Sequence, residues 1–147
     1  MDEVDEVDAI PELLGAAART TAWLSEQIDA GSFDRDPADV ADHCRLPLHF
    51  LAAGELRRAH RALDRIAADF LLDDGDVRSS PSERSVDPFF EEHAAIAGAW
   101  VALAARKLGR FDVAGPTERY LERFFNPELG GFAGRRPYDR GEREVGV

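Results

Sequence analysis

Two polar segments carry the side chains best suited to chemistry. The first contains Asp42, His43 and Arg45, and the second runs from Asp87 to His93. Each lies at or soon after an Asp-Pro pair, a favourable helix start because aspartate caps free N–H groups and proline suits the first turn. If the two helices run parallel, their first turns share one rim of a cavity. Carboxylates at an apolar rim can act as general acids, stabilise a cation or activate water. The candidate catalytic residues are Asp42, His43, Asp87, Glu91, Glu92 and His93.

Apolar and cationic side chains near this rim form the candidate ligand-binding set: Arg45, Phe89, Phe90 and Trp100. Aromatic rings can line an apolar pocket, but they also pack in cores. The polar candidates have structural alternatives too. Asp87 suits an N-cap, the two glutamates suit a helix dipole, and the histidines suit structural hydrogen bonds. Arg45 can instead pair with Asp42 or Glu92.

Metal and cofactor motifs are missing from the sequence. Cys44 is the only cysteine, which excludes an intrachain disulfide and a cysteine-rich zinc site. We find no phosphate-binding glycine loop, no nucleophile elbow and no H-E-x-x-H motif. The sequence therefore predicts a protein without metal or cofactor.

Composition narrows the classes of partner. The net charge of −11 disfavours nucleic acid and anionic membrane surfaces, since both select clustered Lys and Arg. The start, MDEVDEVD, is acidic where a secretory signal would be basic and then apolar. The longest apolar run, from residue 94 to 105, is too short to span a bilayer. We expect a reduced, cytoplasmic protein that contacts an apolar small molecule or a sugar.

An ungapped internal repeat organises the chain. Residues 54–77 and 109–132 match at an offset of 55 residues, which superposes Gly54 on Gly109 and Gly75 on Gly130. The apolar stripe matches as well, for example Phe70 on Phe125. A helical period of this size predicts a repeat of helical hairpins.

The periodicity predicts about five helices and an all-α fold. They span about 10–28, 36–54 with a kink at Pro47, 55–71, 87–108 and 112–126, with a polar loop at 78–86. We expect Pro11 in the first turn of the first helix, Gly31 as its stop, and Phe33 folded back as a hydrophobic clip. Asp36 and Asp112 are expected N-caps. Residues 1–9 form a frayed lead-in, 10–132 the repeat domain and 133–147 a polar tail.

The helices are expected to alternate in kind. The third carries the stripe Leu56, Ala59, Leu63, Ile66 and Phe70. The helix at 87–108 is apolar nearly all round, which predicts burial on most sides. Amphipathic outer helices would therefore cover nearly apolar inner ones.

One segment resembles a known family. Residues 23–33 contain W-L-x-x-Q-x-x-x-G-x-F, formed by Trp23, Leu24, Gln27, Gly31 and Phe33. This resembles the repeat signature of squalene and terpene cyclases, whose α/α toroid is shared with protein prenyltransferases. Inner helices ring a cavity in that fold. The cyclases' D-x-D-D motif is absent, and Asp73–Asp76 lies at a glycine turn, where we expect only a turn.

The resemblance implies an arc of antiparallel hairpins, since a full toroid needs about twice as many helices. Either a second half is missing or two copies close the ring as a homodimer. The first functional hypothesis is an apolar cleft for an isoprenoid-like ligand. The second is a carbohydrate-active enzyme of the six-hairpin type that uses rim carboxylates. The third is a non-catalytic binding or assembly module with an exposed apolar flank.

Overall fold

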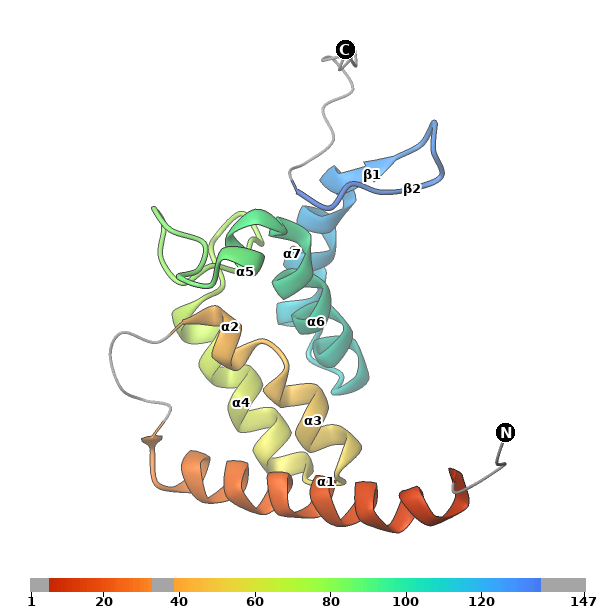
Figure 1. Ribbon diagram of the computed structural model, residues 1–147. Coiled ribbons are helices and arrows are strands. Elements are labelled where there is room, and N and C mark those ends of the chain that lie inside the picture. Colours follow the sequence, from red (N-terminus) through yellow and green to blue (C-terminus); the bar gives the residue numbers. More distant parts are fainter. Residues whose placement is uncertain (1–5, 33–38, 136–147) are drawn as a thin grey trace. The chain divides into compact units, whose positions relative to one another are not determined.

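The computed structural model describes residues 6–32 and 39–135, and for residues 6–9 the backbone alone (Figure 1). These residues are mainly helical, which confirms the predicted all-α class. The predicted five helices are present, but the second and the fourth are each broken in two. The chain divides into two compact units, residues 1–36 and 37–147, which are described separately below.

The first unit contains one long helix, α1 (Glu6–Asp29). It begins four residues earlier than predicted, so Pro11 lies inside the helix rather than in its first turn. Proline costs little here because its fixed φ is helical and the hydrogen bond it omits lies near the helix end. Gly31 has φ of 67°, as expected for a left-handed stop. Phe33 lies outside the described residues, as do Asp36 and Pro37.

The first hairpin of the second unit comprises α2 (Val40–His43), α3 (Leu46–Ala52) and α4 (Leu56–Asp69). Asp39 caps α2, since its carboxylate accepts a hydrogen bond from the N–H of Ala41. The predicted kink at Pro47 is a complete break two residues earlier, which places Pro47 in the first turn of α3. Proline disrupts the turn before it but suits a new helix start.

The second hairpin comprises α5 (Pro88–Glu92), α6 (Ala94–Lys107) and α7 (Phe111–Leu121). Asp87 caps α5 as predicted, but the expected N-cap Asp112 lies inside α7, which begins after Arg110. A 3-10 helix, η2 (Glu122–Phe124), follows α7. The chain then forms a short antiparallel ladder of β1 (Phe125–Asn126) and β2 (Gly131–Phe132) instead of more helix.

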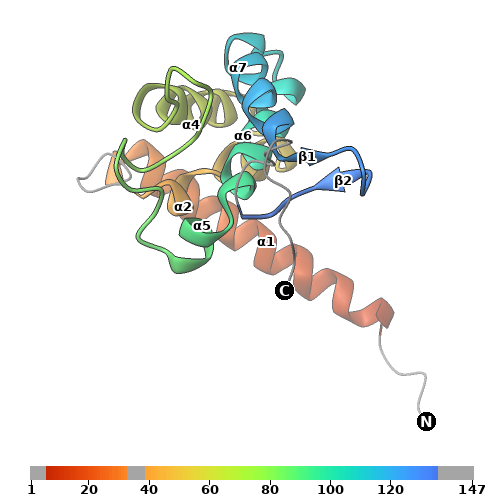
Figure 2. The same cartoon turned by 90° about the horizontal axis from the view of Figure 1, so that it is seen from above.

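The sequence repeat is a structural repeat. Helices α3 and α4 pack side by side after the turn at Gly54, and α6 and α7 do so after Gly109 (Figures 1 and 2). These glycines have φ of 77° and 71°, in the left-handed region that other residues avoid. Their repeat partners Gly75 and Gly130 have φ of 90° and 65°. Each copy of the repeat therefore begins and ends at the same kind of turn.

The core of the second unit lies between the two hairpins. Its members are mainly aliphatic side chains of α4, α6 and α7, together with Phe70 and Phe90: Val40, Cys44, Leu63, Ile66, Phe70, Val77, Phe90, Ala97, Val101, Ala105, Val113 and Ala114. The stripe predicted on α4 is buried at Ala59, Leu63, Ile66 and Phe70, but Leu56 is 56% exposed because it opens the helix beside the Gly54 turn. None of the helices in the described residues is both long enough and apolar enough to cross a membrane.

Candidate functional site

The loop at 78–87 is anchored to the rest of the second unit by side-chain hydrogen bonds on two sides. Asp39, only 7% exposed, accepts hydrogen bonds from Ser85 Oγ at 2.7 Å and from the N–H of Val86 at 2.6 Å. Ser79 Oγ accepts one from the N–H of Val40 at 2.9 Å. Burial alone would raise the pKa of Asp39, but the hydrogen bonds from Ser85, Val86 and Ala41 outweigh it and lower that pKa. The carboxylate therefore stays ionised and holds the loop on α2.

A second buried carboxylate holds the other side of the loop. Asp76, 1% exposed, accepts two parallel hydrogen bonds from the Arg84 guanidinium, both at 2.9 Å. Arg78 Nε donates a third at 2.6 Å, and the N–H of Val77 a fourth at 2.9 Å. Burial opposes ionisation, yet the hydrogen bonds from Arg84 and Arg78 lower the pKa of Asp76. Asp76, Arg78 and Arg84 form a buried ionic network, called here the Asp76 network.

The Asp76 network sits at a turn that contacts α7. Leu72 and Asp76 share a backbone hydrogen bond, and Leu71 pairs with Val77 as an isolated bridge. At Gly75, a Cβ atom would lie 2.1 Å from the backbone oxygen of Pro116. The turn predicted for residues 73–76 is present. Its last residue is a buried anchor and not a solvated side chain.

The predicted catalytic residues of the second segment hold the chain in place. Asp87 accepts a hydrogen bond from the N–H of Phe89, as its alternative role as an N-cap predicts. Glu91 accepts hydrogen bonds from the backbone N–H groups of Arg84 and Ser85, both at 3.1 Å. Glu92 pairs with Arg135 at 2.9 Å. His93 lies at the break between α5 and α6, with its ring 4.7 Å from that of Phe89.

The first segment divides between core and surface. His43 is buried, with its ring 5.1 Å from that of Phe70, whereas Asp42 is exposed. Arg45 stacks over the ring of Phe90 at 5.2 Å, and this contact joins the two predicted segments. Arg45 therefore reaches the segment that contains Glu92, but it contacts an aromatic ring there.

The predicted aromatic ligand-binding residues have separate environments. Phe90 belongs to the core, Phe89 is 47% exposed, and Trp100 on α6 is 39% exposed. Leu103 is 46% exposed on the same helix, so α6 has one exposed stripe, while its other sides are buried as predicted. One turn separates these two residues, and they share a side of the helix.

We define the α6 face as Trp100, Leu103, Lys107 and Phe111. Phe111, the first residue of α7, is 62% exposed, and the Arg106 guanidinium lies over its ring at 5.6 Å. Arg106 and Lys107 make the last turn of α6 basic. Arg106 is paired with Glu118, whereas Lys107 forms no ion pair with any residue that the structure describes. Exposed apolar and basic side chains therefore occur together on α6 and at the start of α7, in a chain of net charge −11.

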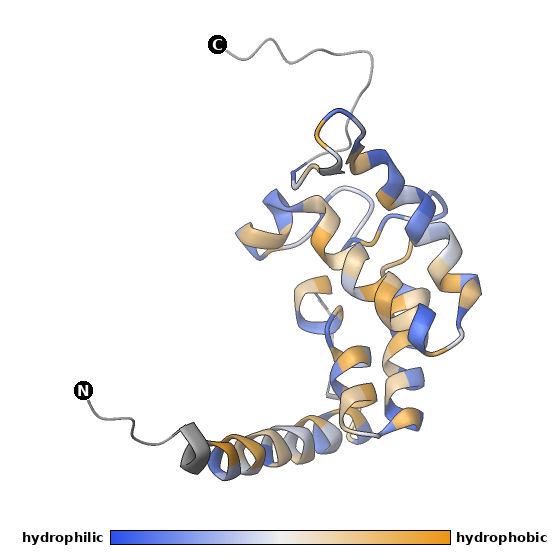
Figure 3. Ribbon diagram, turned by 90° about the vertical axis from the view of Figure 1, so that its right-hand side faces the viewer, coloured by the Kyte–Doolittle hydropathy of each residue, from blue (hydrophilic) through white to orange (hydrophobic). Residues whose placement is uncertain are grey.

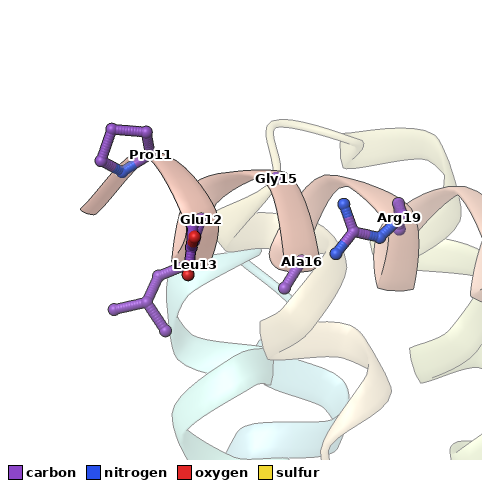
Figure 4. Close-up of a pocket in the computed structure, with 6 residues that line it drawn as sticks. All are labelled: Pro11, Glu12, Leu13, Gly15, Ala16 and Arg19. Atoms are coloured by element: carbon purple, nitrogen blue, oxygen red, sulfur yellow. The ribbon is translucent and has the colours of Figure 1, made fainter. Parts of the chain in front are cut away.

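A shallow hollow lies on α1, where Gly15 and Ala16 leave space beside longer side chains (Figure 4). Its lining residues, Pro11, Glu12, Leu13, Gly15, Ala16 and Arg19, all belong to this one helix.

Within the described ranges, no group of three or more His, Cys, Asp or Glu side chains is arranged to hold a metal ion. Cys44 is buried, and burial raises the pKa of its thiol to about 11.

Comparisons with protein-family models, with curated proteins and with solved structures give no match to the chain. The likeness to the cyclase and prenyltransferase toroid remains a prediction from the W-L-x-x-Q segment.

Proposed function

We propose that this protein is a helical-hairpin binding module whose α6 face takes an amphipathic, acidic segment of a partner protein. The observation that carries the proposal is the exposure of Trp100, Leu103 and Phe111 beside two cations. Exposed apolar side chains that gather on one face are typical of interaction sites. Tryptophan and arginine are also enriched among residues that dominate binding energy.

The basic side chains at the end of α6 favour an acidic partner over a neutral or basic one. Lys107 has no carboxylate within ion-pair distance in the described part of the chain, and Arg106 stands beside it at the helix end. An acidic partner would supply a carboxylate for Lys107 and would be favoured by the local field over a neutral or basic one. This follows the third functional hypothesis, a non-catalytic binding module.

The placement of the polar candidates supports the same proposal. Asp87 and Glu91 accept hydrogen bonds from backbone N–H groups, and Glu92 forms an ion pair with Arg135. Each of the three side chains thus has a structural partner within the chain, as expected of residues that hold a fold together. The isoprenoid and carbohydrate hypotheses stay predictions that no observation here favours.

The test uses Trp100 as the reporter. The chain has two tryptophans, so Trp23→Phe leaves Trp100 as the only one. The probe is a synthetic amphipathic helix of Leu, Ala and Glu, and the control is the same peptide with Lys in place of Glu. We expect the acidic peptide to shift the Trp100 emission to shorter wavelength with saturation, and to lose affinity as salt rises.

Two substitutions make the test specific. Leu103→Asp should abolish the shift, whereas Leu129→Asp should not, because Leu129 is exposed at 84% on the loop between β1 and β2. Lys107→Glu should turn the preference toward the basic peptide. Equal binding of both peptides, or none, would show that the α6 face is not a site for acidic segments.

A further inference from the structure

One ion pair lies directly beside the α6 face. The Arg106 guanidinium donates from Nε and from Nη2 to the two carboxylate oxygens of Glu118, both at 2.6 Å. The same guanidinium lies over the ring of Phe111, which belongs to the α6 face. Both contacts join α6 to α7 within the second unit. An edge that arginine can offer to a foreign carboxylate is therefore already occupied by a carboxylate of the chain itself.

The helical hairpin does not require this ion pair. At the repeat offset of 55 residues, Arg106 corresponds to Leu51. Glu118 corresponds to Leu63, which is fully buried in the core. The first repeat thus forms the same pair of helices with apolar side chains at both positions. Figure 3 shows hydrophilic positions among hydrophobic ones along the helices of the second unit. The second repeat therefore departs from the first by placing opposite charges beside an exposed aromatic ring.

The ion pair is also open to exchange. The side chains of Arg106 and Glu118 are 56% and 32% exposed. Among the residues that the structure describes, Glu118 accepts hydrogen bonds from Arg106 alone. The buried carboxylate of Asp76, by contrast, accepts them from two arginines and a backbone N–H. Exposed ion pairs contribute little to stability, because water and other charges compete for both partners. A carboxylate of a partner can therefore replace Glu118 without disturbing the core.

We propose that Glu118 is a built-in competitor of the acidic partner: it occupies Arg106 in the free protein and gives way to a carboxylate of the bound segment. This inference rests on the proposed function and adds the residue that sets how strongly an acidic segment binds. On binding, Lys107 gains a new ion pair, whereas Arg106 only exchanges one carboxylate for another. The net gain is one ion pair, although two cations are present, so Glu118 weakens binding of the partner.

The test uses the full chain with Trp23→Phe as the reference chain, with the Trp100 emission and the acidic peptide of Leu, Ala and Glu. Glu118→Gln keeps the size of the side chain but frees Arg106. It should lower the dissociation constant about threefold to fivefold, the effect of one exposed ion pair. Glu122→Gln is the matched control, because it removes the same charge one turn further along. Glu122 forms no ion pair with any described residue, so this change should alter the constant less than about twofold.

A double-mutant cycle separates competition from net charge. When Arg106→Gln is already present, Glu118→Gln should change the dissociation constant no more than Glu122→Gln does, because Glu118 then has no cation to occupy. Far-UV circular dichroism should be unchanged in every variant, since none of these side chains belongs to the core.

Two results would overturn the inference alone. One is an equal gain in affinity with and without Arg106, which would show that only the charge of Glu118 matters. The other is an unchanged affinity of Glu118→Gln for a peptide that the reference chain binds. If neither the reference chain nor Glu118→Gln binds the acidic peptide, the proposed function fails together with the inference. Binding by Glu118→Gln alone would support both.

Discussion

The Asp76 network allows a stability prediction worked from its geometry. Asp76→Asn keeps the size of the side chain but removes the charge that four hydrogen bonds share. Removing one partner of a buried ion pair lowers the free energy of unfolding by about 3–5 kcal/mol, since the other partner is left as a desolvated charge without a counter-ion. The Arg84 side chain is 11% exposed and stays buried, whereas that of Arg78 is 29% exposed and can reach water. We therefore expect a loss at the lower end, about 3 kcal/mol.

The assay is urea unfolding followed by far-UV circular dichroism. Asp73→Asn is the matched control, because Asp73 is exposed in the same turn and should change stability by less than about 0.5 kcal/mol. Arg84→Met combined with Asp76→Asn should cost less than the sum of the single changes by about 1–3 kcal/mol. A loss below about 1 kcal/mol for Asp76→Asn would refute the view that this network is a principal anchor.

Three further predictions follow from single sites. Gly75→Ala should destabilise the chain by more than about 3 kcal/mol in urea unfolding, whereas Gly54→Ala should cost only about 1–2 kcal/mol, because both have positive φ but only Gly75 lacks space for a Cβ. Acid unfolding should begin below about pH 4 and the midpoint in urea should be flat above it: Asp39 and Asp76 have lowered pKa values in the folded state, so their stabilisation is lost as pH falls through those values. A pH-independent urea midpoint from 7 to 3 would contradict this. Cys44 should react with iodoacetamide at pH 8 about 100-fold more slowly in the folded than in the unfolded chain, because burial raises the pKa of its thiol from 9.0 to about 11, and similar rates would contradict its burial.

Local chemistry explains which parts of the fold could be predicted. A left-handed backbone is a requirement of single residues, so the turns at Gly54, Gly75, Gly109 and Gly130 were predictable from the repeat. The N-cap at Asp87 was predictable for the same reason, since it depends on three consecutive residues. The all-α class followed from periodicity summed over long windows.

Contacts between distant segments explain why other features of the fold could not be predicted from the sequence. The break at His93 has no nearby proline or glycine to mark it, and Arg84 donates to the carbonyl of Ala94 beside it at 3.3 Å. Asp76 and Arg84 are eight residues apart in a loop, a spacing with no regular geometry. Asp39 and Ser85 are 46 residues apart. Only loop closure brings such groups together, and it leaves no periodic signal.

The same loop determines how the two hairpins unfold. A stack of repeats that touch only as neighbours can lose its units one at a time. Here the loop is bonded to α2 through Asp39, to the end of the first hairpin through Asp76 and to α5 through Glu91. Opening either hairpin therefore breaks bonds to the other. Amide hydrogens of α4 and α7 should consequently exchange through one shared opening of the whole second unit, with equal free energies, rather than through separate openings of each repeat.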